Sequence, residues 1–182
     1  LRCDENGQEF EFELRANTIE RPTVAVQLAL DQSGSMADPA GTSGASRLQV
    51  LKDAATLFAQ LIQKDNAIGI IRFDQDAYPP NDPTYGGLSI TKVVNDNFSD
   101  PTRLAAQGVI AAHGAFGATS VGDGLEMGHN QLAALPAGAY DQKALILMTD
   151  GLENRLKSIA DVSGLIDNRT FAIGLGNEAQ VN

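Results

Sequence analysis

The chain has 182 residues, of which 43% are hydrophobic and 20% are charged, and its formal net charge is −10. These values fit one globular domain of ordinary size with a substantial core. They argue against nucleic-acid binding, which needs clustered Lys and Arg, and no apolar stretch approaches the roughly 20 residues that a membrane-spanning helix needs.

The chain is expected to divide into a short N-terminal segment and one domain. Residues 1–20 are predicted to be an extension or the end of an upstream β module, because Glu9–Leu14 alternates acidic and apolar residues as a half-exposed strand does. The alternative is that Glu9–Leu14 is an edge strand of this domain. Residues 21–182 are expected to form the domain itself. Its first strand is predicted at Thr23–Leu30, a run of β-branched and apolar residues typical of a strand buried on both faces.

Helical and strand patterns alternate along the rest of the chain. A helix is predicted to begin after Ser46, which forms a plausible capping box with Gln49. Strands that alternate with helices imply a mostly parallel sheet with helices on both faces. The remaining predicted elements are strands at Ala67–Phe73, Leu88–Val94, Lys143–Thr149 and Thr170–Leu175, and helices from Asp100–Pro101 to the break at Gly114–Gly117, from Thr119–Ser120 to about Leu135, and at Ser158–Asp167, with Ala37–Ser46 and Asp74–Gly87 as loops.

Two of the predicted central strands end in a carboxylate, Asp31 and Asp150. In open α/β sheets ligands bind at the carboxyl ends of the strands, where two Asp side chains would repel each other unless a cation lay between them. Ser33 and Ser35 follow Asp31 at alternate positions, so their hydroxyls are expected to face the same way. An oxygen-only ligand set suits Mg²⁺, Mn²⁺ or Ca²⁺, whereas one Cys and two separated His argue against zinc.

The run Asp31-Gln32-Ser33-Gly34-Ser35-Met36 resembles the metal-ion-dependent adhesion site of von Willebrand factor type A domains, which include the integrin inserted domains. Gly117-Ala118-Thr119-Ser120 is similar to the loop that supplies the Thr of that site. Thr149-Asp150-Gly151 is similar to the strand end that supplies its second Asp, and Ile173–Gly176 resembles the strand that follows. The resemblance extends from about Arg21 to Gly176.

The resemblance implies a Rossmann-like sheet with one antiparallel edge strand, for which Leu88–Val94 is the candidate. It implies that Ser33 and Ser35 bind the cation through their hydroxyls, that Thr119 binds it directly or through water, and that Asp31 and Asp150 act largely through bridging waters. Because the sequence stops at Asn182, the family's last strand and helices are expected to be missing.

The function that follows is a non-enzymatic adhesion-type module whose cation binds an Asp or Glu carboxylate of a partner protein. Met36 and Leu152 are expected to add apolar surface around the ion, and placement outside the cell or at its surface is expected over a cytoplasmic one. The alternative is a Mg²⁺-dependent phosphohydrolase of the haloacid-dehalogenase type with Asp31 as nucleophile. That family requires a second Asp where Ser33 stands. A site that has lost its metal affinity is a third possibility, although all five expected side chains are present.

Other suggestive residues receive structural interpretations. His113 and His129 are predicted to be exposed or core-edge residues on helices, not general bases. Asp123 is expected to serve the first turn of its helix. Glu153 and Asn154 are expected to be solvated loop residues, with a role beside the site as the alternative. Gly174–Ala179 matches a dinucleotide fingerprint but lies at the end of the chain, not after a first strand.

Overall fold

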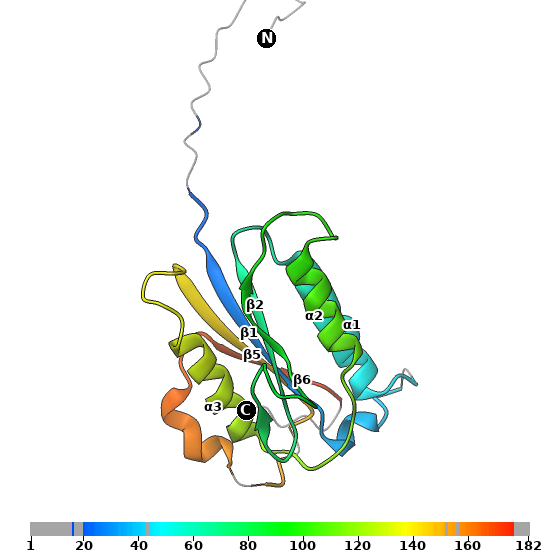
Figure 1. Cartoon of the computed structure of the whole chain (residues 1–182). Helices are drawn as coiled ribbons and strands as arrows, with labels where there is room; N and C mark the ends of the chain where they lie inside the picture. The colour runs from blue at the N-terminus through cyan, green and yellow to red at the C-terminus, as the bar shows by residue number, and fades with distance from the viewer. Residues whose placement is uncertain (1–15, 17–19, 43, 152, 156, 177–182) are drawn as a thin grey trace, which may run out of the picture.

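The computed structural model describes residues 16, 20–42, 44–151, 153–155 and 157–176. The strand predicted at Glu9–Leu14 lies outside this part of the chain. The described residues form three layers, with a central sheet between α1 and α2 on one face and α3 on the other (Figure 1). The predicted α/β class and the helices on both faces are confirmed.

The sheet, as far as the structure describes it, contains six strands in the order β3-β2-β1-β5-β6, with β4 also paired to β2. The four central strands run parallel, and two short strands pair antiparallel to β2. The antiparallel strand predicted at Leu88–Val94 is confirmed, whereas the loop predicted at Asp74–Gly87 contains a two-residue strand. The strands are β1 (Val24–Asp31), β2 (Ala67–Phe73), β3 (Ala77–Tyr78), β4 (Leu88–Lys92), β5 (Gln142–Thr149) and β6 (Thr170–Gly174).

Two apolar clusters, one on each face, hold the helices to the sheet. Alternate residues of β1 point to opposite faces, so Leu28 packs toward α1 and α2 whereas Ala29 packs toward α3. The small side chain of Ala29 and the glycines of α3 let that helix lie close to the sheet. The helices are α1 (Arg47–Leu61), α2 (Pro101–Ala111) and α3 (Val121–Ala133), with 3₁₀ turns η1 (Gly34–Ala37) and η2 (Ile159–Leu165).

Two local details differ from the predicted pattern. The segment predicted as a helix at Ser158–Asp167 is a 3₁₀ helix. Ser46 caps α1 by accepting a hydrogen bond from the Gln49 backbone, but the Gln49 side chain donates to Asp53 instead of completing the capping box. None of the helices in the described residues is long and apolar enough to cross a membrane.

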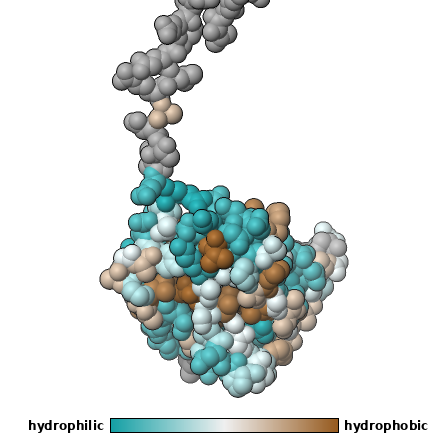
Figure 2. All heavy atoms as spheres, turned by 45° about the horizontal axis from the view of Figure 1, so that its top comes forward, coloured by the Kyte–Doolittle hydropathy of each residue, from teal (hydrophilic) through white to brown (hydrophobic). Residues whose placement is uncertain are grey.

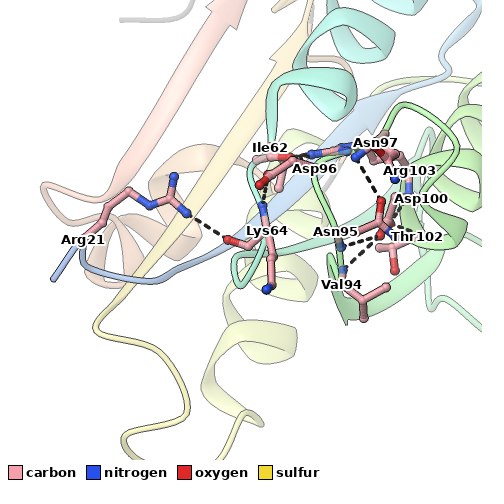
Figure 3. Close-up of polar contacts among 10 residues, drawn as sticks. All are labelled: Arg21, Ile62, Lys64, Val94, Asn95, Asp96, Asn97, Asp100, Thr102 and Arg103. Atoms are coloured by element: carbon pink, nitrogen blue, oxygen red, sulfur yellow. Dashed lines mark hydrogen bonds and ion pairs between the residues drawn. The ribbon is translucent and has the colours of Figure 1, made fainter.

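A buried polar cluster fixes the loop before α2 near the amino end of β2 (Figure 3). The Asp100 carboxylate accepts hydrogen bonds from the backbone N–H groups of Val94 and Asn95 at 3.0 Å, and from those of Thr102 and Arg103. Burial alone would raise the pKa of Asp100, but these hydrogen bonds lower it below its usual value. The Arg103 guanidinium in turn donates to two backbone carbonyls. These hydrogen bonds hold the loop before α2 in place.

The surface around the amino ends of the strands is mostly hydrophilic, and its hydrophobic groups are scattered (Figure 2). A continuous apolar patch is the usual mark of a docking face, and this view shows none. The carboxyl ends of the strands lie at the other edge of the sheet, where the predicted site residues are placed.

Candidate metal-binding site

Backbone hydrogen bonds between loops bring the predicted site segments together. The N–H of Gln32 donates to the carbonyl of Phe73 at 2.8 Å, and that of Phe116 donates to the carbonyl of Gln32 at 2.7 Å. The N–H of Gly34 donates to Gly117 O at 3.1 Å. A Cβ at Gly34 would lie 3.2 Å from that oxygen, so the close approach of the two loops favours glycine. The loop after β1 is thereby fixed against the loop that carries Thr119.

Asp31 lies at the end of β1 and is fully buried. Its Oδ1 accepts a hydrogen bond from Ser33 N at 2.8 Å, and its Oδ2 accepts one from Thr149 Oγ1. Burial raises the pKa of Asp31 to about 6, and the charge of Asp150 adds to the rise, although hydrogen bonds from Thr149 and Ser33 oppose it. A carboxylate in such surroundings is costly to ionise, and a neighbouring cation would remove the cost.

The two serines after Asp31 present their hydroxyls side by side. Ser33 Oγ and Ser35 Oγ lie 3.2 Å apart, with Ser33 directly before η1 and Ser35 within it, and Ser33 is almost fully buried. The alternate spacing therefore places both hydroxyls on one side of the turn, as predicted. Hydroxyl and carboxylate oxygens are the kind of ligand that a hard divalent cation takes.

Thr119 contributes a buried hydroxyl for which the described residues offer no hydrogen-bond partner. Its backbone is held firmly, since Thr119 N donates to Asn154 Oδ1 at 2.9 Å and its carbonyl accepts from Asn154 N and Arg155 N at 3.1 Å. A buried hydroxyl without a partner is unfavourable, and a bound cation is one group that would satisfy it. Asn154 is exposed, as predicted for a loop residue, but it also supports the site from outside.

Asp150, at the end of β5, is paired with an arginine that the sequence did not single out. Arg47 Nη1 lies 2.8 Å from Asp150 Oδ2, and the two side chains are 8% and 1% exposed. Gly151 follows with a φ of +76° and donates its N–H to Thr149 Oγ1 at 3.0 Å. The turn after β5 thus connects back to the hydroxyl that also contacts Asp31.

The five predicted residues therefore gather at one edge of the sheet, although only some of them touch directly. Asp31 contacts Ser33, and Ser33 contacts Ser35, whereas Thr119 and Asp150 reach the group through neighbouring residues. Within the described residues no three His, Cys, Asp or Glu side chains gather as a metal-binding group. Any cation here would rely on hydroxyls beside two carboxylates, which fits Mg²⁺, Mn²⁺ or Ca²⁺ better than zinc.

The structure corrects the prediction for His113. This residue follows α2 and is buried, and its Nε2 lies 2.9 Å from the backbone oxygen of Asp31. Burial lowers the pKa of His113 to about 4, so the ring is neutral at physiological pH. The buried, neutral side chain therefore supports the end of β1 through this hydrogen bond. Asp123 takes the predicted structural role, since it accepts a hydrogen bond from Ser120 Oγ at 2.6 Å in the first turn of α3.

The expectation that Met36 adds apolar surface is also wrong, because Met36 is fully buried in the core, and Leu152 lies outside the described residues. Phe116, whose backbone N–H bonds Gln32 in the loop after β1, is an apolar residue that is 37% exposed. Its ring lies 5.1 Å from that of Tyr85, and Tyr85 lies 4.7 Å from Tyr78, measured between ring centroids. We call Phe116, Tyr85 and Tyr78 the aromatic cluster. Phe116 is 31 positions from Tyr85, so no local pattern joins it to the two tyrosines.

Comparisons with known proteins agree with this architecture. The family model of the von Willebrand factor type A domain matches residues 26–153. No curated protein matches the chain. Among solved structures, the three N-terminal domains of the type V pili tip protein Mfa5 from Porphyromonas gingivalis are 22% identical with a TM-score of 0.55, covering 72% of this chain and 20% of that one.

Two further solved structures share the fold. The PilB minor pilin from Streptococcus sanguinis is 20% identical with a TM-score of 0.58, covering 75% of this chain and 32% of its own. The conserved hypothetical protein BatB from Bacteroides thetaiotaomicron is 20% identical with a TM-score of 0.59, covering 85% and 66%. The chain thus spans less than two thirds of Mfa5 and PilB, and identities this low establish the fold alone. With most of its length matched by the family model, the chain belongs to the von Willebrand factor type A domain family.

Proposed function

We propose that this domain is a divalent-metal-dependent protein-recognition module that binds an acidic group of a partner. Its cation, Mg²⁺ or alternatively Mn²⁺ or Ca²⁺, would be held by the five oxygen-bearing residues at the carboxyl edge of the sheet. The observation that carries the proposal is the buried Thr119 hydroxyl, which lacks a partner among the described residues and stands on the loop bonded to the Ser33–Ser35 turn. The set is Asp31, Ser33, Ser35, Thr119 and Asp150, the arrangement of a metal-ion-dependent adhesion site.

The protein groups explain why an anionic ligand would be favoured. Three of the five donors are neutral hydroxyls, so a divalent cation among them keeps much of its charge and attracts a carboxylate. The Asp or Glu side chain of a partner is the natural source of such a group. The partly exposed Phe116, with Tyr85 behind it, would offer apolar contact to the residues around that carboxylate.

The relatives support a role in adhesion. The fold occurs in a pili tip protein, in a minor pilin and in the pilus adhesin SpaC from Lactobacillus rhamnosus GG. These proteins suggest a recognition domain placed outside the cell or at its surface, which is also the placement we propose here.

A phosphohydrolase mechanism with Asp31 as nucleophile has less support. Both carboxylate oxygens of Asp31 already accept hydrogen bonds, from Ser33 N and Thr149 Oγ1. The position of the expected general acid is occupied by Ser33, and the guanidinium of Arg47 is directed to Asp150. A nucleophile needs an accessible oxygen and a neighbouring acid, so we propose that the domain binds without catalysing.

Calorimetric titration with Mg²⁺ and with Mn²⁺ tests the proposal. The wild-type domain should show one site, which Asp31→Ala and the double variant Ser33→Ala with Ser35→Ala should both abolish. Asp167→Ala is the matched control, because Asp167 is an exposed acid in the turn before β6, where its side chain bonds Arg169 and Thr170. Binding that persists in both site variants, or wild-type protein that binds neither metal, would refute the metal site.

A further inference from the structure

The ion pair between Arg47 and Asp150 is buried and well aligned. The two side chains are 8% and 1% exposed, with 2.8 Å between Nη1 and Oδ2. Arg47 is the first residue of α1, after the capping residue Ser46. A positive charge in the first turn of a helix is unfavourable, because the helix dipole is positive at that end. Stabilisation of α1 therefore does not explain an arginine at this position.

The surroundings of Arg47 fix its direction. Its backbone N–H donates to the carbonyl of Asp38 at 2.9 Å, which closes the loop between η1 and α1. On the other side lies Gly176, with a φ of +102°, where a Cβ would stand 2.7 Å from Arg47 Nε. The backbone after β6 thus packs directly against the guanidinium. Arg47 connects the start of α1, the end of β5 and the end of β6 around one member of the proposed metal site.

We propose that Arg47 is a positioning residue of the metal site, one that holds Asp150 and cancels its charge. This inference rests on the function proposed above. The two negative charges of Asp31 and Asp150 alone would neutralise the two positive charges of a divalent cation. With Arg47 present, the loaded site keeps one net positive charge, which favours an anionic partner, and the metal-free site avoids two unpaired carboxylates. Arg47 therefore lowers the affinity of the site for the metal and raises the affinity of the loaded site for an acidic ligand.

Titration of Arg47→Gln with Mn²⁺ and Mg²⁺ tests this assignment. The variant should bind the metal about tenfold more tightly than wild type, because a positive charge a few ångströms from the ion has been removed in partly desolvated surroundings. Arg47→Lys keeps the charge and should stay near the wild-type affinity. Arg169→Gln changes the net charge equally in an exposed arginine at the other end of β6, and should leave the affinity unchanged.

Thermal unfolding supplies a second readout that does not depend on a partner. In EDTA, Arg47→Gln should melt below wild type, and saturating Mg²⁺ should raise its melting temperature by more than it raises that of wild type. If Arg47→Gln does not fold in EDTA, Mg²⁺ should restore its circular dichroism, and Arg47→Met should behave in the same way. A variant that Mg²⁺ does not restore would show a purely structural role for Arg47.

The outcomes separate the two proposals. If wild type binds neither metal, the proposed function fails and this inference fails with it. If wild type binds metal but Arg47→Gln binds with equal or weaker affinity, the metal site stands and the role assigned to Arg47 is wrong. Tighter binding in Arg47→Lys as well as in Arg47→Gln would also contradict the inference, because the charge is retained in that variant.

Discussion

The imidazole Nε2 of His113 lies 2.9 Å from the backbone oxygen of Asp31, and both residues are buried. A carbonyl oxygen only accepts hydrogen bonds, so the neutral ring must carry its proton on Nε2. The contact fixes the last residue of β1, from which the turn bearing Ser33 and Ser35 begins. His113, 82 positions from Asp31, thus helps to fix the point at which the Ser33–Ser35 segment leaves β1.

This contact predicts that His113 contributes stability that is lost in acid. Burial lowers the pKa of His113 from 6.5 to about 4. Between these values the unfolded chain binds a proton that the folded chain does not, so stability falls as the pH drops from about 6.5 toward 4, by on the order of 3 kcal/mol for this group. Urea unfolding at several pH values should show wild type losing stability relative to His113→Gln as the pH falls from about 6.5 to 4. Equal slopes in both proteins would contradict the assignment.

Thr119→Val should have opposite effects on stability and on metal binding. Thr119 Oγ1 has no partner among the described residues, so removing it should leave the metal-free protein as stable as wild type or slightly more stable. The same change should weaken Mg²⁺ binding at least about tenfold, since a ligand of a hard cation is lost. Calorimetry and thermal melting in EDTA measure the two effects.

Thr149→Val is the matched control for this experiment. Thr149 Oγ1 donates to Asp31 and accepts from Gly151 N, so its removal should destabilise the metal-free protein by about 1–3 kcal/mol. If Thr119→Val destabilises the metal-free domain as much as Thr149→Val does, the Thr119 hydroxyl has a structural partner and the proposed ligand role loses its main support.

Asp31→Asn should stabilise the metal-free domain at neutral pH. The pKa of Asp31 is raised from 3.8 to about 6, mainly by burial, so the folded protein retains a proton that the unfolded chain releases. Stability from this group is therefore complete below about pH 3.8 and is lost as the pH rises through 6, which amounts to roughly 2–3 kcal/mol. In EDTA, the stability of Asp31→Asn relative to wild type should increase between pH 4 and pH 7.

The metal reverses the comparison. Mg²⁺ should raise the melting temperature of wild type at pH 7 and leave that of Asp31→Asn almost unchanged, since ligand binding stabilises only a protein that binds it. A variant that is less stable than wild type in EDTA across this pH range would show that the ionised carboxylate is needed for folding itself.

The sequence allowed the parallel core of the sheet and four of the five proposed ligands to be predicted from local signals, whereas Thr119 was assigned only through the resemblance to the family. Asp31 and Asp150 directly follow buried apolar runs, and a residue that follows a parallel strand must lie at the carboxyl edge. Ser33 and Ser35 follow from their alternate spacing. Once the fold is known, the parallel strands alone place these segments at the same edge of the sheet.

The supporting residues could not be predicted because their partners are distant in sequence. Arg47 is 103 positions from Asp150, and its place at the start of a helix gives no sign of that pairing. The helical pattern around His113 predicts an exposed or core-edge side chain, but His113 follows the end of α2 and is buried. Met36 was expected at the surface because it sits in a loop-like motif, whereas the 3₁₀ turn directs it into the core. Local patterns assign an element, but not which of its residues meet another part of the chain.

The close packing of α3 against the sheet gives the last prediction, which concerns stability and not the metal site. A Cβ at Gly124 would lie 2.7–3.1 Å from three ring atoms of Phe73, and that ring is fully buried. The ring cannot move away without displacing other core residues, so Gly124→Ala should cost about 1–3 kcal/mol of unfolding free energy. Gly108 in α2 is the matched control, because a Cβ there meets nothing within 4 Å. Gly108→Ala should stabilise the domain by about 0.5–1 kcal/mol, since alanine favours the helix. Urea denaturation of both variants measures the difference, and a Gly124→Ala domain as stable as Gly108→Ala would mean that α3 does not need glycine to approach the sheet.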